Sequence, residues 1–202
     1  MGFGYDVLSD LNTRIIMVNT SAYGQFGPYS EKIGYGPVGE CISGVTMTIG
    51  EEGWPPVQAR VSLIDRTTAL HAAIGVLSAL RERDSSGLGQ TIDLCLADSG
   101  YSYTEIPVSA YAGSGIEPKR GEGGGAPPSG IYPCKDGHVL ITAGDQHQWH
   151  RVCDALGRPD WLEDPRFTTR SERAKNREAV DEAVREVLVT KTPPEAVEHF
   201  TT

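Results

Sequence analysis

The stretch "VSLIDRTTALHAAIGVLSALRERDSSGLGQTIDL", residues 61–94, decides the fold class. Its opening apolar residues predict a short strand that ends at Asp65, and the apolar positions after Thr67 follow helical spacing until "SSGLGQ" ends the helix. The segment "TIDLCLA" then predicts another strand. Two strands joined by such a helix form a parallel, right-handed crossover, so we predict an α/β fold. The apolar helical positions are Leu70, Ala73, Ile74, Leu77 and Leu80.

Upstream of this stretch, the sequence predicts half of a βαβ unit. Residues 5–11 have a helical pattern, and "RIIMVNTSAYG", residues 14–24, predicts a buried strand that runs into a loop. Residues 24–40 are rich in Gly and Pro and are expected to form a loop. A helix that feeds a parallel strand normally packs on an earlier strand, so we expect the domain to be cut at its beginning.

Downstream, residues 112–130 hold many Gly and Pro residues, which is typical of a linker or a functional loop. The segment "GIYPCKDGHVLITAG" then predicts a β-hairpin around Asp136-Gly137, followed by a helix capped by Asp145 and a second helix over 172–189. We therefore predict part of a large α/β domain over 1–111 and a smaller α+β domain over 131–202, incomplete at its end.

Composition narrows the class of protein. The 202 residues are 39% hydrophobic and carry a net charge of -9, without a basic run that would bind nucleic acid or an anionic membrane. The four cysteines are far apart in the sequence and indicate free thiols in a reducing compartment. Neither a signal peptide nor a long apolar run is recognised, so a cytoplasmic protein that does not enter a membrane is expected.

Asp65 is the main candidate for chemistry. Open α/β sheets place ligand sites at the carboxyl ends of their strands, where the predicted position of Asp65 falls. A carboxylate there could equally cap the helix by accepting hydrogen bonds from its first N–H groups. His71, six residues later, could be a base or a structural residue of the helix surface. Asp65 and His71 therefore each have a functional and a structural interpretation.

Other reaction classes find no support in the sequence. The segment "GEGGG", residues 121–125, lacks the Lys-Ser/Thr of a phosphate-binding loop. The chain contains no HxxxH, paired CxxC or Gly-x-Ser-x-Gly motif, so we expect no metal site and no serine nucleophile.

Four segments, in order, resemble the class III CoA-transferase family, which includes formyl-CoA and carnitine CoA-transferases and α-methylacyl-CoA racemases. They are "LNTRIIMVNTSAYGQFGPYSEKIGYGPVGECISG", "LIDRTTALHAAIGVLSALRERDSSGLGQTIDLCLAD", "GIYPCKDGHVLITAG" and "CDALGRPDWLEDPRFTTRSERAKNR". The similarity runs from about Tyr5 to Phe200, and "RERDSSGLGQTIDL" is its most specific part. The resemblance implies part of a Rossmann-like large domain with a parallel sheet, followed by a smaller domain of a hairpin plus helices.

The resemblance assigns a role to Asp65, which stands where the family's transferases have their nucleophile. Attack on an acyl-CoA would give a mixed anhydride, and returning CoA thiolate would form an aspartyl-CoA thioester that loads an acceptor carboxylic acid. The implied partners are an acyl-CoA and a small carboxylic acid. Coenzyme A is then a substrate, and no permanently bound cofactor is expected.

Further site residues follow from the same resemblance. Ser21 and Ala22 match a stretch that touches CoA, and Tyr23 matches an aromatic residue near the active site, although it could be a core aromatic. Gly123, Gly124 and Gly125 match a glycine loop that shields the thioester from water in some relatives. A plain linker is the alternative for these glycines.

Two departures from the family leave alternatives open. The racemases pair the aspartate with a histidine where this chain has Tyr35 in "IGYGP", and a phenol with a pKa near 10 transfers protons poorly in both directions, which favours a transferase over a racemase-like epimerase. Family chains are also longer at both ends and form interlocked dimers. A homodimer is therefore expected, and a truncated, non-catalytic fragment is the alternative to an active enzyme.

Overall fold

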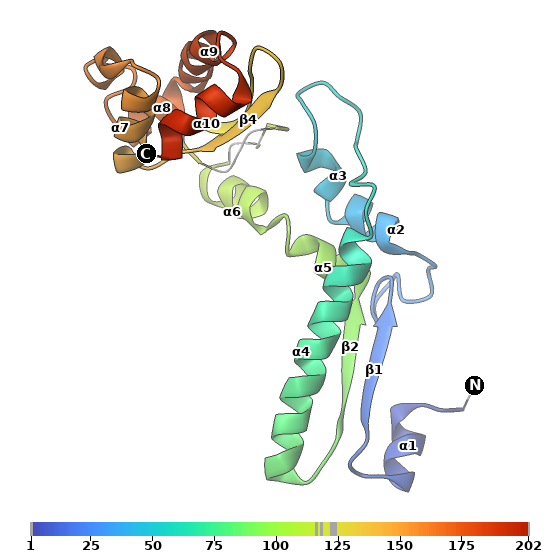
Figure 1. Ribbon diagram of the computed structural model, residues 1–202. Helices are drawn as coiled ribbons and strands as arrows, with labels where there is room; N and C mark the ends of the chain where they lie inside the picture. Colours follow the sequence, from blue (N-terminus) through green and yellow to red (C-terminus); the bar gives the residue numbers. More distant parts are fainter. Residues whose placement is uncertain (1, 116, 118, 122–124, 202) are drawn as a thin grey trace. The chain divides into compact units, whose positions relative to one another are not determined.

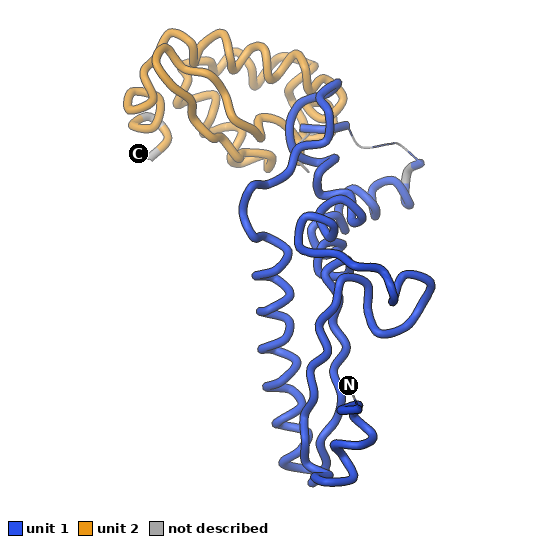
Figure 2. Tube along the Cα trace, turned by 90° about the vertical axis from the view of Figure 1, so that its right-hand side faces the viewer, with its two compact units in different colours: residues 1–121 blue, residues 122–202 orange. Residues whose placement is uncertain are grey.

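The computed structural model describes residues 2–115, 117, 119–121 and 125–201. The chain divides into two compact units, residues 1–121 (unit 1) and residues 122–202 (unit 2), coloured blue and orange in Figure 2. The division falls inside the Gly-rich stretch 112–130, and the last helix of unit 1, α6 (Glu105–Ser114), extends into that stretch.

Unit 1 is built on a parallel pair of strands, β1 (Ile16–Ser21) and β2 (Gln90–Cys95), with Ile16 opposite Gln90 and Ser21 opposite Cys95. The long helix α4 (Leu63–Ser86) precedes β2 and runs alongside both strands (Figure 1). This arrangement confirms the predicted α/β class with a parallel crossover. The strand that pairs with β2 is β1, whereas the sequence pattern had suggested residues 61–64.

The prediction of a strand over residues 61–64 is wrong. Residues 61 and 62 are irregular, and α4 already begins at Leu63, which makes Asp65 the third helical residue. Ile64 is fully buried and packs with Ala22 and Leu96 in the small core of this unit. A short apolar run fits a buried first helical turn as well as a strand, because periodicity alone does not distinguish the two.

The predicted loop 24–40 is also partly helical. Helix α2 (Gly36–Ile42) begins with Pro37 in its first turn, where the missing N–H of proline costs little. At Gly39, an added Cβ would lie 2.9 Å from Ile64 Cγ2 and 3.0 Å from the Leu96 carbonyl oxygen. The glycine therefore lets α2 pack closely on the starts of α4 and of α5 (Leu96–Tyr101). The remaining helices of unit 1 are α1 (Tyr5–Leu11) and α3 (Val45–Thr48).

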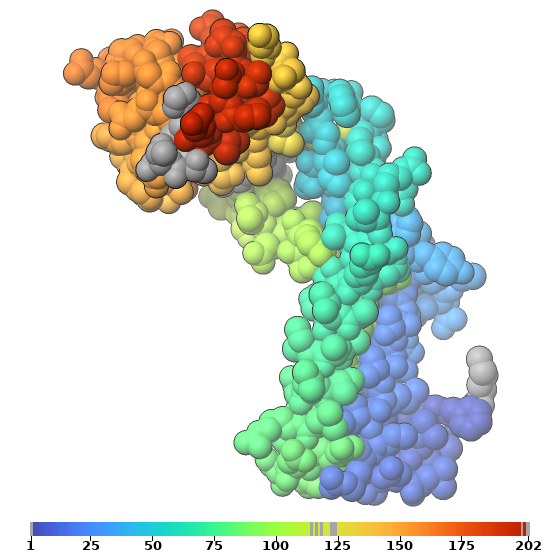
Figure 3. Space-filling view, in the orientation of Figure 1, coloured from blue at the N-terminus to red at the C-terminus, as the bar shows by residue number. Residues whose placement is uncertain are grey.

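Helix α4 packs on the sheet through small residues and leaves large apolar ones outside. Ala79 is buried, and a Cβ at Gly75 would lie only 3.3 Å from Ile92 Cγ2 on β2. Leu70, Ile74 and Leu77 are 65%, 62% and 66% exposed. Figure 3 shows the turquoise atoms of α4 at the surface along the helix.

Contrary to the sequence-based expectation, α4 is long and apolar enough to cross a membrane by length and composition, although its first turn carries Asp65 and Arg66. This statement covers the part of the chain that the structure describes. A long apolar helix that packs on a sheet meets the same criterion, and α4 does pack on β1 and β2.

Unit 2 opens with the predicted hairpin. β3 (Ser129–Pro133) pairs antiparallel with β4 (His138–Thr142), and the Cys134 N–H donates to the Gly137 carbonyl at 2.7 Å across the turn. Helix α7 (Gln146–Ala155) begins with a capping box between Asp145 and Gln148, and Gly157 follows its end at a φ of 69°. The hairpin and the capped helix were both expected from local sequence signals.

The single helix predicted over 172–189 is two helices, α8 (Arg170–Lys175) and α9 (Arg177–Leu188). Asn176 separates them with a ψ of 33°, and its side-chain amide donates to the Glu172 carbonyl at 2.9 Å. Asparagine competes for backbone groups in this way, which interrupts the helix although no Gly or Pro is present. A 3-10 turn (Pro159–Leu162) and α10 (Pro193–Thr201) complete the unit.

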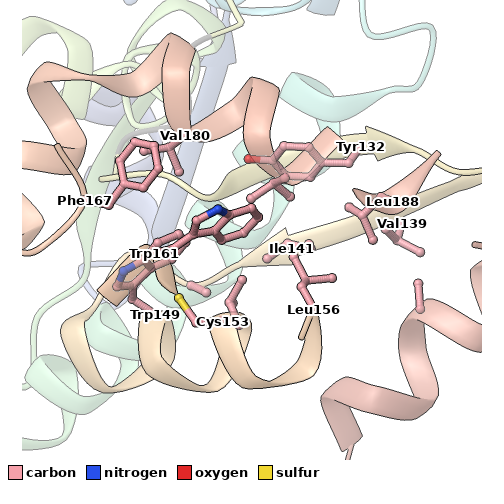
Figure 4. Packing of buried hydrophobic residues seen from close by; sticks show 14 residues of the cluster. Tyr132, Val139, Ile141, Trp149, Cys153, Leu156, Trp161, Phe167, Val180 and Leu188 are labelled. Atoms are coloured by element: carbon pink, nitrogen blue, oxygen red, sulfur yellow. The ribbon is translucent and has the colours of Figure 1, made fainter. Parts of the chain in front are cut away.

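The core of unit 2 is a cluster of fourteen buried apolar side chains, most of them labelled in Figure 4. Trp149 and Trp161 stack with ring centroids 5.8 Å apart, and Phe167 meets both rings edge-on. The buried Arg173 lies over Trp149, and its guanidinium donates to the carbonyls of Pro127 (3.0 Å) and Gly144 (2.9 Å). Arg173 thereby ties α8 to the segments that flank the hairpin. Burial of this guanidinium lowers its pKa.

Candidate functional site

Asp65 lines two cavities at the start of α4. The first, of about 490 Å³, is lined mainly by small residues and is called the small-residue cavity. The second, of about 510 Å³, is called the arginine cavity. Asp65 belongs to both linings. The small-residue cavity is lined by Asp65 with Thr20, Ser21, Ala22, Gly34, Thr68, Ala69, Ala72 and Leu96. The arginine cavity is lined by Asp65 with Pro37, Gln58, Arg60, Val61, Ser62 and Arg66.

The carboxyl edge of the parallel sheet builds the small-residue cavity. β1 ends at Ser21 and β2 at Cys95, in register, so the residues that follow both strands meet at one edge. The Ala22 carbonyl accepts a hydrogen bond from the Ala97 N–H at 3.1 Å, which fixes this edge. Ligand sites of open α/β sheets lie at such edges. The site therefore lies at the carboxyl edge of the sheet, as expected, but the strand that forms this edge together with β2 is β1 and not residues 61–64.

Glycine at position 36 allows the chain to approach the Asp65 carboxylate. An added Cβ on Gly36 would lie 2.8 Å from Asp65 Cγ and closer still to Oδ2. Carbon atoms do not approach so closely, so a larger residue would displace either the carboxylate or the start of α2. Gly36 thus sets one wall of the space around Asp65, next to Pro37 of the arginine cavity.

The Asp65 carboxylate is not a helix cap. Ser62 occupies the N-cap position of α4, while Asp65 lies within its first turn and is exposed. The carboxylate forms no hydrogen bond or ion pair with any residue that the structure describes. The helix dipole stabilises a negative charge in the first turn, and this stabilisation does not require the carboxylate oxygens to accept a hydrogen bond. The capping alternative for Asp65 is therefore wrong.

The structure brings together only some of the predicted site residues. Ser21 and Ala22 share the small-residue cavity with Asp65. Tyr23 lies beside them but packs against the core of Ala22, Ile64 and Leu96, and meets Tyr29 edge-on at 5.5 Å. These contacts favour the core aromatic alternative, and a role of Tyr23 near the active site stays a prediction.

The predicted glycine loop is only partly described. Gly123 and Gly124 lie outside the described residues. Gly125 belongs to unit 2, where its carbonyl accepts a hydrogen bond from the Arg177 guanidinium. The role proposed for the three glycines therefore stays a prediction.

His71 contacts a neighbouring helix. Its Nδ1 lies 3.3 Å from the Ser99 hydroxyl of α5, and the ring is half-buried. Neither cavity beside Asp65 includes His71 in its lining. These contacts favour the structural interpretation, in which His71 joins α4 to α5.

Sequence reasoning missed three residues around Asp65. Gly36 borders the carboxylate, and Arg60 and Arg66 line the arginine cavity. Arg66 directly follows Asp65, which is a signal that the sequence did contain. Arg60 and Gly36 offered no such signal, because their proximity depends on how distant segments pack.

Cysteine and metal chemistry find no further support within the described residues. No group of three or more His, Cys, Asp or Glu side chains is placed to hold a metal ion in that part of the chain. The four cysteines are free thiols. Burial raises the pKa of the Cys95 thiol, whose Sγ accepts a hydrogen bond from the Asp98 N–H at 3.2 Å and caps α5. A buried thiol with a raised pKa is a poor nucleophile.

Known proteins are similar to this chain in sequence. The model of the family described as CoA-transferase family III matches residues 1–202. An acyl-CoA transferase of Fusarium pseudograminearum is 33% identical over 99% of this chain and 44% of that protein. A succinyl-CoA–D-citramalate CoA-transferase of Chloroflexus aurantiacus is 34% identical over 91% of this chain and 46% of that protein.

A solved structure agrees with these matches. The crystal structure of a CAIB/BAIF family protein from Brucella suis superimposes with a TM-score of 0.77 at 28% sequence identity, covering 99% of this chain and 53% of that protein. The chain spans about half the length of the curated relatives that it matches.

Proposed function

Because the chain belongs to CoA-transferase family III, we propose that it takes part in moving CoA from an acyl-CoA to a carboxylic acid, with Asp65 as the nucleophile. The observation that carries this proposal is the position of Asp65. Its carboxylate is exposed, has no partner among the described residues and lies where two cavities meet at the carboxyl edge of the sheet. Because the carboxylate is neither a cap nor part of an ion pair with a described residue, it is free to act as a nucleophile.

The chemistry begins with attack of an Asp65 oxygen on the thioester carbonyl carbon, which breaks the C–S bond and releases CoA thiolate. The product is a mixed anhydride between Asp65 and the donor acid. Thiolate then attacks the aspartyl carbonyl, the donor acid leaves as a carboxylate, and an aspartyl-CoA thioester remains. An acceptor carboxylate reverses the two steps, and Asp65 is regenerated as acyl-CoA forms.

Each of these steps exchanges one anion for another, so none requires a proton to be removed. A general base beside Asp65 is therefore unnecessary, which agrees with the position of His71 outside both cavities. The tetrahedral intermediates need hydrogen-bond donors instead, and the first turn of α4 is a source of N–H groups, apart from that of Leu63, which donates to the Val61 carbonyl at 2.7 Å.

The observations favour a transferase over a racemase-like epimerase. A racemase needs a second group that exchanges the α-proton, and the residue at the matching position, Tyr35, is 74% exposed and absent from both cavity linings.

The exposed apolar residues of α4 support a second proposal, that a partner copy covers unit 1 in a homodimer.

The test replaces Asp65 with asparagine, which keeps the shape of the side chain and removes the nucleophile. In the purified chain, we expect CoA transfer to fall by about a thousandfold or more, because covalent catalysis is lost as a whole. Hydroxylamine added during turnover should label Asp65 as a hydroxamate, detected by mass spectrometry of peptides. Asp84→Asn, an exposed carboxylate on the same helix, is the matched control and should transfer CoA normally.

Two results would count against the proposal. Full transfer by the Asp65→Asn variant would show that another group is the nucleophile. A chain that neither binds acyl-CoA nor transfers CoA would support the alternative of a non-catalytic fragment.

A further inference from the structure

The arginine cavity is lined by two cations and one carboxylate, Asp65. Arg60 and Arg66 are both exposed, and neither guanidinium forms a hydrogen bond or an ion pair with a described residue. Elsewhere in unit 1, arginine side chains bind backbone carbonyls: Arg120 donates to Met47 at 3.0 Å, and Arg83 donates to Arg14 at 3.1 Å. The two arginines nearest Asp65 form no such bond with a described residue, and neither does Arg81 farther along α4.

Arg60 occupies a backbone conformation that favours glycine. Its φ is 59°, and it is the one non-glycine residue with a positive φ in the part of the chain that the structure describes. Such a conformation is unfavourable for a residue with a Cβ, and it persists where the surrounding structure or a function requires that side chain. At position 60, the unfavourable backbone brings a guanidinium to the cavity beside Asp65.

The rest of the lining suits an anion. Gln58 contributes an amide and Ser62 a hydroxyl, both able to donate hydrogen bonds. Asp65 is the one carboxylate of the lining, and two arginines against one aspartate leave a net charge of +1. The planar guanidinium offers paired N–H donors that match both oxygens of a carboxylate.

We propose that Arg60 and Arg66 bind a carboxylate carried at the far end of the acyl group, so that the donor and acceptor acids of this protein are dicarboxylic acids. The inference rests on the proposed function of Asp65. In that reaction, the thioester carbonyl sits at Asp65 with CoA on one side and the acyl chain on the other. Two cavities share Asp65, one for each of these parts of the substrate. In this proposal, the small-residue cavity lies on the side of CoA and the arginine cavity holds the acyl chain.

A phosphate of CoA is the other anion that arginines could bind. The whole pantetheine arm stands between the thiol of CoA and its nearest phosphate, whereas Arg66 is the neighbour of the nucleophile in the sequence and in the cavity. The Arg66 guanidinium, so close to the reacting carbonyl, would contact the acyl group and not a phosphate of CoA. The carboxylate is therefore the anion that fits.

The first test measures binding of succinate to the purified chain, with butyrate as the probe that has the same number of carbons but one carboxylate. Succinate should bind the natural chain more tightly than butyrate does, and Arg66→Met should weaken succinate binding about tenfold or more, because one charge-assisted hydrogen-bond pair is lost. Arg81→Met, an exposed arginine on the same helix, is the matched control and should bind succinate normally.

Position 60 supplies a variant that keeps the fold. Glycine accepts a φ of 59° without strain, so Arg60→Gly should be folded at least as well as the natural chain while it loses succinate binding. Arg60→Lys keeps the charge and should bind succinate with intermediate strength. Undiminished succinate binding by both Arg60→Gly and Arg66→Met would overturn the proposal.

A transfer assay separates this inference from the function it rests on. Arg66→Met should lower kcat/KM for succinyl-CoA about tenfold and leave kcat/KM for butyryl-CoA unchanged. An equal loss with both thioesters would assign the arginines to CoA phosphates and overturn the inference. Normal transfer by Asp65→Asn would instead refute the proposed function, and the succinate titration would still decide whether the arginine cavity binds a dicarboxylate.

Discussion

Units 1 and 2 differ in how completely they bury their apolar residues. Within the described residues, unit 2 has a core cluster of fourteen side chains, whereas the corresponding cluster of the longer unit 1 contains three, Ala22, Ile64 and Leu96. Unit 1 instead exposes large apolar side chains along α4, and its parallel sheet has two strands. Parallel sheets are normally covered on both faces, so unit 1 presents surface that suits a partner.

The larger apolar core and the candidate site lie in different units of the chain. The candidate nucleophile and both cavities belong to unit 1, where the core is small. Unit 2 has a continuous aromatic and aliphatic core and satisfies its buried Arg173 with backbone carbonyls. We therefore expect substitutions in unit 2 to change stability and substitutions near Asp65 to change activity.

The largest effect is expected from Trp149→Ala. Trp149 is fully buried and contacts Trp161 and Phe167, so its removal should cost unit 2 about 3–5 kcal/mol of unfolding free energy. Amide hydrogen exchange followed by mass spectrometry reads the two units separately. Loss of protection in unit 2 with unchanged protection in β1 and β2 is the expected result. Equal loss in both units would show that they unfold as one.

Gly36→Ala should affect activity more than stability. The added Cβ would collide with the Asp65 carboxylate and displace it, and a misplacement of this kind lowers a rate by about a hundredfold. CoA transfer is the measurement, with the denaturant midpoint as the check on folding. Gly113→Ala is the matched control, because a Cβ at position 113 meets nothing within 4 Å. Unchanged transfer by Gly36→Ala would mean that the carboxylate has room to move.

High pH should destabilise unit 2 through Cys153. Burial raises the pKa of this thiol to about 12 in the folded protein, from a value of 9.0 for an exposed thiol. The contribution of the protonated thiol to stability is complete below the unfolded pKa and is lost as the pH rises from about 9 towards about 12. The slope is at most about 1.4 kcal/mol per pH unit.

Urea unfolding of unit 2 between pH 8 and pH 11 measures this slope, and Cys153→Ala should flatten it relative to the natural chain. A slope that is the same in both proteins would assign the alkaline transition to other groups. Tyr132 is one such group, because burial and its hydrogen bond to Asp181 also raise its pKa.

The smallest effect is expected from Leu77→Ala on the exposed face of α4. Leu77 is 66% exposed, so its truncation should change the unfolding free energy by less than about 0.5 kcal/mol. Leu188→Ala applies the same change to a fully buried leucine of unit 2 and should cost about 2–5 kcal/mol. Equal costs at the two positions would show that the face of α4 is already covered in solution, and sedimentation would then identify a dimer.

Much of unit 2 was predictable because its signals are local. The Asp136-Gly137 turn specifies the hairpin, and Asp145 with Gln148 three residues later specifies the start of α7. The break between α8 and α9 was missed because the segment "RSERAKNREAV", residues 170–180, contains no Gly or Pro that would mark a helix end. A side chain that competes for backbone hydrogen bonds leaves no trace in the spacing of apolar residues.

In unit 1, the type of fold was predictable and the pairing was not. The sequence pattern predicted the long helix α4 and the following strand β2, but the strand that pairs with β2 is β1, far upstream in the chain. The run "VSLI" was misread because a buried first helical turn and a short strand share one apolar pattern.

The α/β class, the hairpin, the caps and the candidate role of Asp65 could all be predicted from the sequence, because each depends on neighbouring residues or on a resemblance along the chain. Tertiary structure alone decided that Asp65 is not a cap, that Gly36 lies against its carboxylate and that Arg60 and Arg66 share its cavity. These contacts join segments whose approach depends on packing of the whole unit. No local pattern of residues encodes such an approach.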